Sequence, residues 1–174
     1  MPFRKEIDEN FRFLILEVRS QLEDAQRILA KPGSVPAETL DSRDDYIDNL
    51  KGVIESKCFS LIFTVGEEDT DAVDLLKSVI VITSNLERIA DFANNLVGQT
   101  KYLKTPAVFE TYDPTPIFTV IFKAYDLIQN AVFTTDIQAA LEICKSETEV
   151  DARYEETFRK LLDQNFKELP QWNS

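Results

Sequence analysis

The 174-residue sequence contains no histidine, and this absence excludes several kinds of site at once. Without histidine, the chain has no Ser-His-Asp triad, no imidazole general base and no Glu-x-x-His ligands of the ferritin-like di-iron type. Only four glycines occur, none of them in a phosphate-binding loop, and there is no Cys-x-x-Cys pair. Any chemistry in this chain must therefore come from carboxylates.

Cysteines and long apolar runs are also scarce. Two cysteines, Cys58 and Cys144, do not indicate a disulfide framework. No uninterrupted apolar run is long enough to cross a bilayer, and the opening "MPFRKEIDENF" lacks the apolar stretch of a signal peptide. We therefore expect a cytoplasmic protein with reduced thiols.

The charge balance excludes one large class of partner. The net charge is −12, so the phosphate backbone of DNA or RNA would be repelled and no nucleic-acid partner is expected. Hydrophobic residues make up 44% of the chain and charged residues 29%, a composition typical of a folded domain with a buried core.

Apolar residues recur at helical spacing along most of the chain, and proline and glycine divide the pattern into pieces. Helices are predicted at 11–30, 36–65, 69–101, 116–133 and 135–168, the last one starting with a capping box formed by Thr135 and Gln138. Strand signals are weak. The fold class predicted is an all-α bundle with antiparallel neighbouring helices.

A faint internal repeat divides this bundle. A shift of 103 positions places Asp44 on Glu147 and Asp48 on Asp151. Nothing in the second half corresponds to the helix at 69–101. We expect residues 1–103 to form one complete three-helix repeat and residues 104–174 to form a second repeat that lacks its last helix.

Three acidic pairs with helical spacing are the candidate site residues. They are Asp44/Asp48, Glu87/Asp91 (with Asn94 on the same strip) and Glu147/Asp151. Carboxylates at i and i+4 repel each other, but facing pairs from adjacent helices would form an oxygen-rich cation site. Asp151 also lies on the heptad line of Ile137, Cys144 and Phe158, where it interrupts an apolar seam.

A plainer interpretation competes with the metal site. A chain with 31 acidic residues contains several i,i+4 acidic pairs by chance, and most acids lie on solvated faces. Spacing alone favours this plainer interpretation.

The stretch "LERIADFANNL" (86–96) resembles the signature Leu-Glu-Arg-Ile-Gly-Asp-x-Ala-x-Asn-Ile of the PhoU family, regulators of bacterial phosphate uptake. Residues 43–62 resemble that family's second helix, and residues 140–162 resemble the matching helix of its second repeat. The resemblance implies tandem three-helix bundles whose Glu/Asp-x-x-x-Asp motifs bind metal in some members. The implied ligands of iron, or of another divalent or trivalent cation, are Asp44, Asp48, Glu87, Asp91, Asn94, Glu147 and Asp151.

The sequence departs from the family pattern at four points, one of which is Leu76, where the family often has arginine. Ala90 replaces the usual glycine, and Lys51 stands where a glutamate is common. Because Lys51 removes a ligand and adds a positive charge, we expect weak or partial metal occupancy. The closing helix of the second repeat is missing, which predicts either an N-terminal fragment of a longer protein or a divergent member.

The function implied by the resemblance is a non-enzymatic regulator of phosphate uptake and phosphate signalling. It would be an adaptor between the ATPase subunit of a phosphate transporter and a sensor histidine kinase. Two alternatives stay open: a carboxylate-only metal-dependent hydrolase, and the cytoplasmic accessory part of a sodium–phosphate symporter. The symporter would need a membrane domain before Met1, which reads as a native start.

The incomplete second repeat also predicts self-association. Without a sixth helix, the helix at 135–168 should leave apolar surface uncovered along Cys144, Tyr154, Phe158 and Leu161. Contiguous apolar surface of this kind drives association. We therefore expect a homo-oligomer formed through the helices at 116–133 and 135–168.

Overall fold

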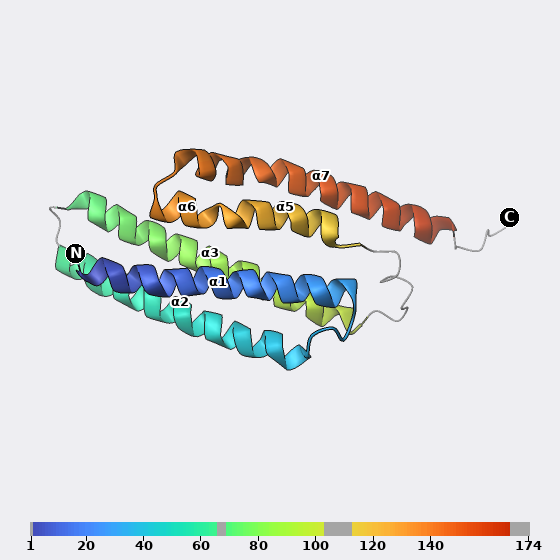
Figure 1. The fold of residues 1–174 in the computed structure, drawn as a ribbon, viewed down its shortest axis with the longest axis horizontal. Coiled ribbons are helices and arrows are strands. Elements are labelled where there is room, and N and C mark those ends of the chain that lie inside the picture. Colours follow the sequence, from blue (N-terminus) through green and yellow to red (C-terminus); the bar gives the residue numbers. More distant parts are fainter. Residues whose placement is uncertain (1, 66–68, 103–112, 168–174) are drawn as a thin grey trace. The chain divides into compact units, whose positions relative to one another are not determined.

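The computed structural model describes residues 2–65, 69–102 and 113–167 (Figure 1). Within these ranges every regular element is a helix, so the all-α prediction is confirmed. The chain divides into two compact units, Met1–Pro106 and Ala107–Ser174.

The first unit is a bundle of three long helices. They are α1 (Pro2–Ala30), α2 (Ala37–Val65) and α3 (Thr70–Thr100), and each packs against the other two. The start of α1 lies before the predicted position 11. Ile7, in this added stretch, is buried, so the apolar face of α1 extends further toward the N-terminus than the sequence pattern indicated.

The connections of the first unit follow from local chemistry. Gly33 has φ 78° in the turn between α1 and α2, a left-handed conformation that glycine adopts at little cost. The side chain of Asp69 accepts a hydrogen bond from the backbone N–H of Ala72 at 3.1 Å and thereby caps the start of α3. Both features hold the long helices in an antiparallel arrangement.

The core of this unit is formed by apolar side chains that recur at helical spacing. Leu14 and Val18 on α1, and Ile47 and Ile54 on α2, are fully buried. Ala90 on α3, at the position where the family signature has glycine, is also fully buried. The methyl group of this alanine is therefore accommodated in the core.

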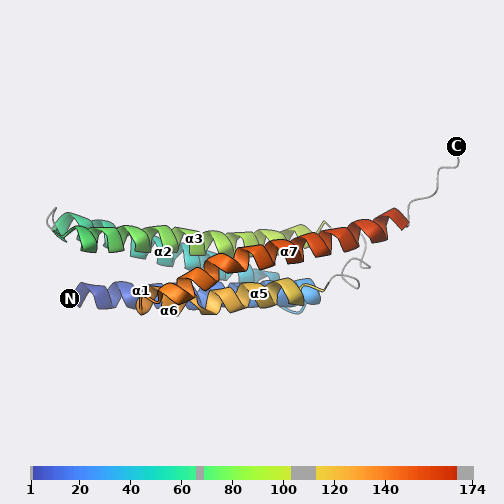
Figure 2. The ribbon, with the colours of Figure 1, turned by 90° about the horizontal axis from the view of Figure 1, so that it is seen from above.

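The second unit contains α5 (Thr115–Asp126), α6 (Ile128–Phe133) and α7 (Ile137–Lys167), and α7 packs against both of the others. Figure 2 shows α5 and α6 running nearly end to end. The single helix predicted at 116–133 is divided at Leu127. The backbone N–H of Leu127 donates to the carbonyl oxygen of Ala124 at 3.2 Å, a spacing of three residues that tightens the chain there.

The start of α7 differs from the predicted capping box. Asp136, not Thr135, is the cap: its Oδ1 accepts hydrogen bonds from the backbone N–H groups of Gln138 (2.9 Å) and Ala139 (3.1 Å). Thr135 has φ 55°, outside the range of an ordinary cap residue. The prediction was wrong by one residue because two adjacent residue types both favour this position.

None of the helices that the structure describes is both long enough and apolar enough to cross a membrane.

Candidate functional site

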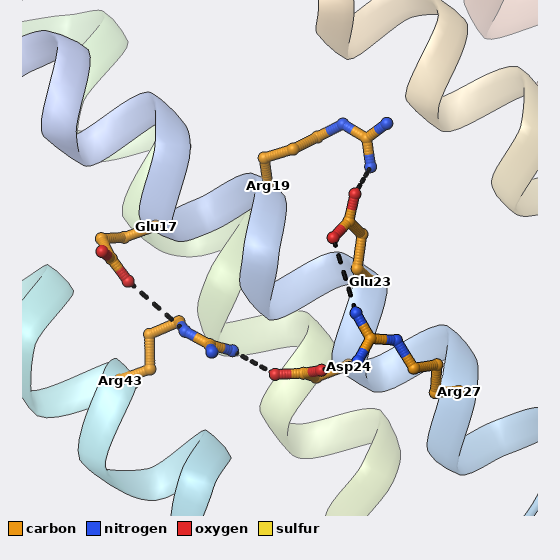
Figure 3. A network of polar contacts seen from close by, with 6 residues as sticks. All are labelled: Glu17, Arg19, Glu23, Asp24, Arg27 and Arg43. Carbon is orange, nitrogen blue, oxygen red and sulfur yellow. Dashed lines mark hydrogen bonds and ion pairs between the residues drawn. The ribbon is translucent and has the colours of Figure 1, made fainter. Parts of the chain in front are cut away.

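A charged network fixes α2 against α1 and so positions the candidate residues on α2 (Figure 3). Arg43 on α2 donates to Asp24 on α1 at 2.6 Å and lies 3.4 Å from Glu17. The Asp24 side chain is only 8% exposed. Because a buried carboxylate needs a cationic partner, this contact ties the start of α2 to α1.

The network continues along α1 itself. Arg27 lies 3.2 Å from Asp24 and 3.7 Å from Glu23, and Glu23 accepts a hydrogen bond from Arg19 at 2.9 Å. Figure 3 shows the six side chains forming one chain of alternating charge. Three arginines balance three carboxylates, so the network adds no net charge to the interface.

On the other face of α2, polar side chains meet those of α3 in a line that we call the acidic row. Following α2 from Asp44 to Lys51 to Glu55, the partners run backwards along α3 from Asn94 to Glu87 to Ser84. This order confirms that α2 and α3 are antiparallel. The members of the acidic row are Asp41, Asp44, Asp48, Lys51, Glu55, Ser84, Glu87, Asp91 and Asn94.

One end of the acidic row is built around Asp44. The side-chain amide of Asn94 donates to Asp44 at 3.2 Å and to Asp41 at 3.4 Å. Burial raises the pKa of Asp44 above its ordinary value; the hydrogen bond from Asn94 acts in the opposite direction, and the charges of Asp91, Asp48 and Asp41 add to the rise. Asn94 is therefore a hydrogen-bond donor to carboxylates in this structure.

Further along the acidic row, toward Glu55, an ion pair joins the two helices. The ammonium of Lys51 lies 3.1 Å from Glu87, whose side chain is 12% exposed. Burial lowers the pKa of Lys51, but the hydrogen bond and charge of Glu87, with the charges of Glu55 and Asp48, raise it by more, so the net shift is upward. Ser84 donates to Glu55 at 2.9 Å and fixes that carboxylate.

Asp48 and Asp91 occupy the middle of the acidic row. In the order of the paired residues, Asp48 falls between Asp44 and Lys51, and Asp91 falls between Asn94 and Glu87. Neither carboxylate makes an ion pair or hydrogen bond to another side chain in the described part of the chain. Asp91 is half-buried beside the α2–α3 interface, whereas Asp48 is exposed at its edge.

The acidic row does not fit a metal ion as it stands. In the described ranges, no three His, Cys, Asp or Glu side chains are placed to hold one metal ion together. Metal sites for hard cations need several oxygens converging at short distance. Here Glu87 is paired with an ammonium and Asp44 with an amide, so the assignment of these residues as metal ligands stays a prediction.

The third acidic pair lies in the other unit. Glu147 and Asp151 are both exposed on α7. The heptad line that contains Asp151 is not a buried seam of this chain, since Ile137 and Phe158 on the same line are 68% and 50% exposed. The position of Asp151 on this exposed apolar line agrees with the sequence pattern, and its assignment as a metal ligand stays a prediction.

Two of these contacts were not predicted from the sequence. The partnership of Arg43 with Asp24 joins residues on different helices, and no local pattern identifies it. Lys51 was noted as a departure from the family pattern, but its partner Glu87 was counted only as a metal ligand. The antiparallel register of α2 and α3 is the information that links them.

Comparison with known proteins places these features in a family. Residues 13–100 match the model of the PhoU domain, just over half of the chain and most of α1, α2 and α3. No solved structure shows a significant match.

Two similar proteins carry the name phosphate-specific transport system accessory protein PhoU homolog. The one from Caulobacter vibrioides (strain NA1000 / CB15N) is 31% identical over 153 residues, covering 82% of this chain and 63% of the relative. The one from Clostridium acetobutylicum is 27% identical over 148 residues, covering 82% of this chain and 66% of the relative. The chain thus spans slightly less than two thirds of each relative's length. With a domain match that covers its three-helix unit, this chain belongs to the PhoU domain family.

Proposed function

We propose that this chain is a non-enzymatic regulator of phosphate uptake and phosphate signalling in the cytoplasm. The observation that carries the proposal is the PhoU domain match over the three-helix unit, because both similar proteins are named as accessory proteins of phosphate-specific transport. The chain acts as an adaptor between the transporter ATPase subunit and a sensor histidine kinase.

The charge of the chain supports a regulator and not a phosphate carrier. With a net charge of −12, the surface repels an anion such as phosphate. The composition supports the lack of catalysis, since no histidine and no nucleotide-binding loop are present. The described residues also lack the three converging ligands that a carboxylate-only hydrolase would need.

The test is genetic and biochemical. In bacteria that lack this chain, we expect a phosphate-starvation reporter to be active in phosphate-rich medium and to be silenced when the chain is restored. Purified full-length chain should bind the ATPase subunit or the cytoplasmic part of the kinase in biolayer interferometry. An unchanged reporter together with no binding to either protein would contradict the proposal. Turnover of a phosphate ester that Asp91→Asn abolishes would favour the hydrolase instead.

We also propose that the chain forms a homo-oligomer through α7. Large apolar side chains are exposed along this helix, and Tyr154 stacks on Phe158 with ring centroids 6.2 Å apart. The exposed side chains are Ile137, Leu141, Cys144, Tyr154, Phe158 and Leu162; the side chain of Leu161 lies outside the described residues. A symmetric dimer is the commonest way to cover such a face.

Analytical ultracentrifugation at micromolar concentration tests this oligomer. We expect wild-type chain to sediment as a dimer and Phe158→Glu to sediment as a monomer. Phe63→Glu is the matched control, because Phe63 is 88% exposed on α2 of the other unit and should leave the dimer intact. A wild type that stays monomeric would show that α7 does not need a second copy.

A further inference from the structure

The acidic row contains one cation of its own, Lys51. The row brings six carboxylates to the α2–α3 interface: Asp41, Asp44, Asp48, Glu55, Glu87 and Asp91. Like charges gathered on two packed helices repel each other unless a positive charge lies among them. Lys51 is a positively charged side chain that pairs with a carboxylate of the row, Glu87.

Lys51 is held among carboxylates from both helices. Glu87 on α3 contacts its ammonium at 3.1 Å, while Asp48 and Glu55 on α2 lie one turn before and one turn after it and act on it through their charges. Ser84 fixes Glu55 by a hydrogen bond of 2.9 Å. The side chain of Lys51 is 28% exposed, so most of its surface is covered by the neighbouring side chains.

We infer that Lys51 is the resident cation of the acidic row and holds the place beside Glu87 that a divalent metal ion would otherwise take. The ammonium supplies the positive charge that the facing carboxylates require. A metal ion would have to displace it and break the contact with Glu87. The first unit of this chain is therefore stable without metal, and its row binds metal only when Lys51 is removed.

The remaining parts of the acidic row agree with this assignment. At the Asp44 end, Asn94 donates hydrogen bonds to Asp44 and Asp41, which satisfies those carboxylates without a cation. An amide that donates its N–H groups in this way is not oriented to offer its oxygen to a metal. The Asn94 amide and the Lys51 ammonium thus contact carboxylates in two different parts of the row. This inference concerns the ion chemistry of the row and does not depend on the transport role proposed above.

The test is manganese binding to the full chain after treatment with a chelator. Isothermal titration calorimetry with MnCl₂ should detect no saturable site at the row in the wild type. Lys51→Met should gain one saturable Mn²⁺ site, because a neighbouring positive charge has been removed. Thermal unfolding should show the same difference: excess MnCl₂ should raise the melting temperature of Lys51→Met and leave the wild type unchanged.

Lys77→Met is the matched control, since it removes the same charge from an exposed pair with Asp74 in the same unit. It should behave as the wild type does. Equal Mn²⁺ affinity in the wild type and in Lys51→Met, or no gain of binding in a folded Lys51→Met, would overturn the inference.

A measurement on the wild type keeps the inference testable if Lys51→Met fails to fold. Acetic anhydride labelling followed by mass spectrometry compares the reactivity of the two ammonium groups. Lys51 should be acetylated several-fold more slowly than Lys77, because its ammonium is held by Glu87 and its pKa is raised. Equal labelling rates would show that Lys51 is not held in the row and would overturn the inference.

Discussion

Replacing Arg43 by methionine should destabilise the first unit strongly. The substitution keeps most of the side-chain length but removes the hydrogen bond of 2.6 Å to Asp24 and the ion pair of 3.4 Å to Glu17. Asp24, whose side chain is 8% exposed in the wild type, then keeps the ion pair with Arg27 at 3.2 Å among the contacts of the described residues. The substitution therefore removes a partner from the Asp24 carboxylate, which water cannot easily reach.

The magnitude follows from these contacts. A hydrogen bond between charged groups contributes about 1.5–3 kcal/mol, and a partly exposed ion pair such as that with Glu17 adds roughly 0–1 kcal/mol. Because Arg27 remains beside Asp24, we expect Arg43→Met to lower the free energy of unfolding by about 2–3 kcal/mol. For a unit of this size, the melting temperature should fall by on the order of 10 °C.

Urea denaturation followed by circular dichroism at 222 nm measures this loss. A double-mutant cycle of Arg43→Met with Asp24→Asn should give a coupling energy of at least about 1.5 kcal/mol. Arg88→Met is the control, because Arg88 is exposed and its nearest described partner is the ring of Phe92 at 5.9 Å; it should cost less than about 1 kcal/mol. A coupling energy below about 0.5 kcal/mol would refute the claim that this pair holds α2 against α1.

Two further predictions concern the acidic row and the start of α7. The raised pKa of Asp44 means that the folded state keeps this proton to a higher pH than the unfolded state does, so the group costs stability as the pH rises from the unfolded value of 3.8 through the folded pKa. Asp44→Asn should remove this cost and raise the free energy of unfolding at pH 7 by about 0.5 kcal/mol. Urea denaturation over that pH range should then show a weaker pH dependence than in the wild type; an unchanged pH dependence would contradict the prediction. In α7, Asp136→Ala should lower the free energy of unfolding by about 1 kcal/mol in urea denaturation, because two backbone N–H groups lose their acceptor. Asp136→Asn should lower it by only about 0.3 kcal/mol. Equal decreases for the two variants would argue against Asp136 as the cap.

Helix positions could be predicted because burial and sequence spacing agree in the first unit. Ile47 and Ile54 lie seven residues apart on α2, and both are fully buried, as an apolar stripe requires. The break at Leu127 could not be predicted, since its cause is a backbone hydrogen bond that any residue type allows. The cap of α7 was predicted one residue too early, because Thr135 and Asp136 are both residue types that cap helices.

The sequence predicted where the candidate site residues lie, but not which side chains they contact. The spacing of Glu87 and Asp91 placed both on one strip of α3, and the short connection from α2 placed that strip against Asp44 and Asp48. The partner of Glu87 depends on the register between two helices, which spacing within one helix does not determine. For Asp151, periodicity gave the correct line along α7 but not which face of that helix its neighbours cover.

The lengths of the helices in the second unit have a consequence for α7. Twelve residues in α5 and six in α6 span about 27 Å, whereas the 31 residues of α7 span about 46 Å, so one end of α7 extends past α5 within its own unit (Figure 1). Pairs one turn apart link Arg159 to Glu155 at 3.1 Å and Lys160 to Glu156 at 2.7 Å in that stretch. Such pairs weaken as added electrolyte screens them. High ionic strength should therefore unwind the end of α7 gradually, as a sloping loss of ellipticity before the cooperative transition of the packed helices begins.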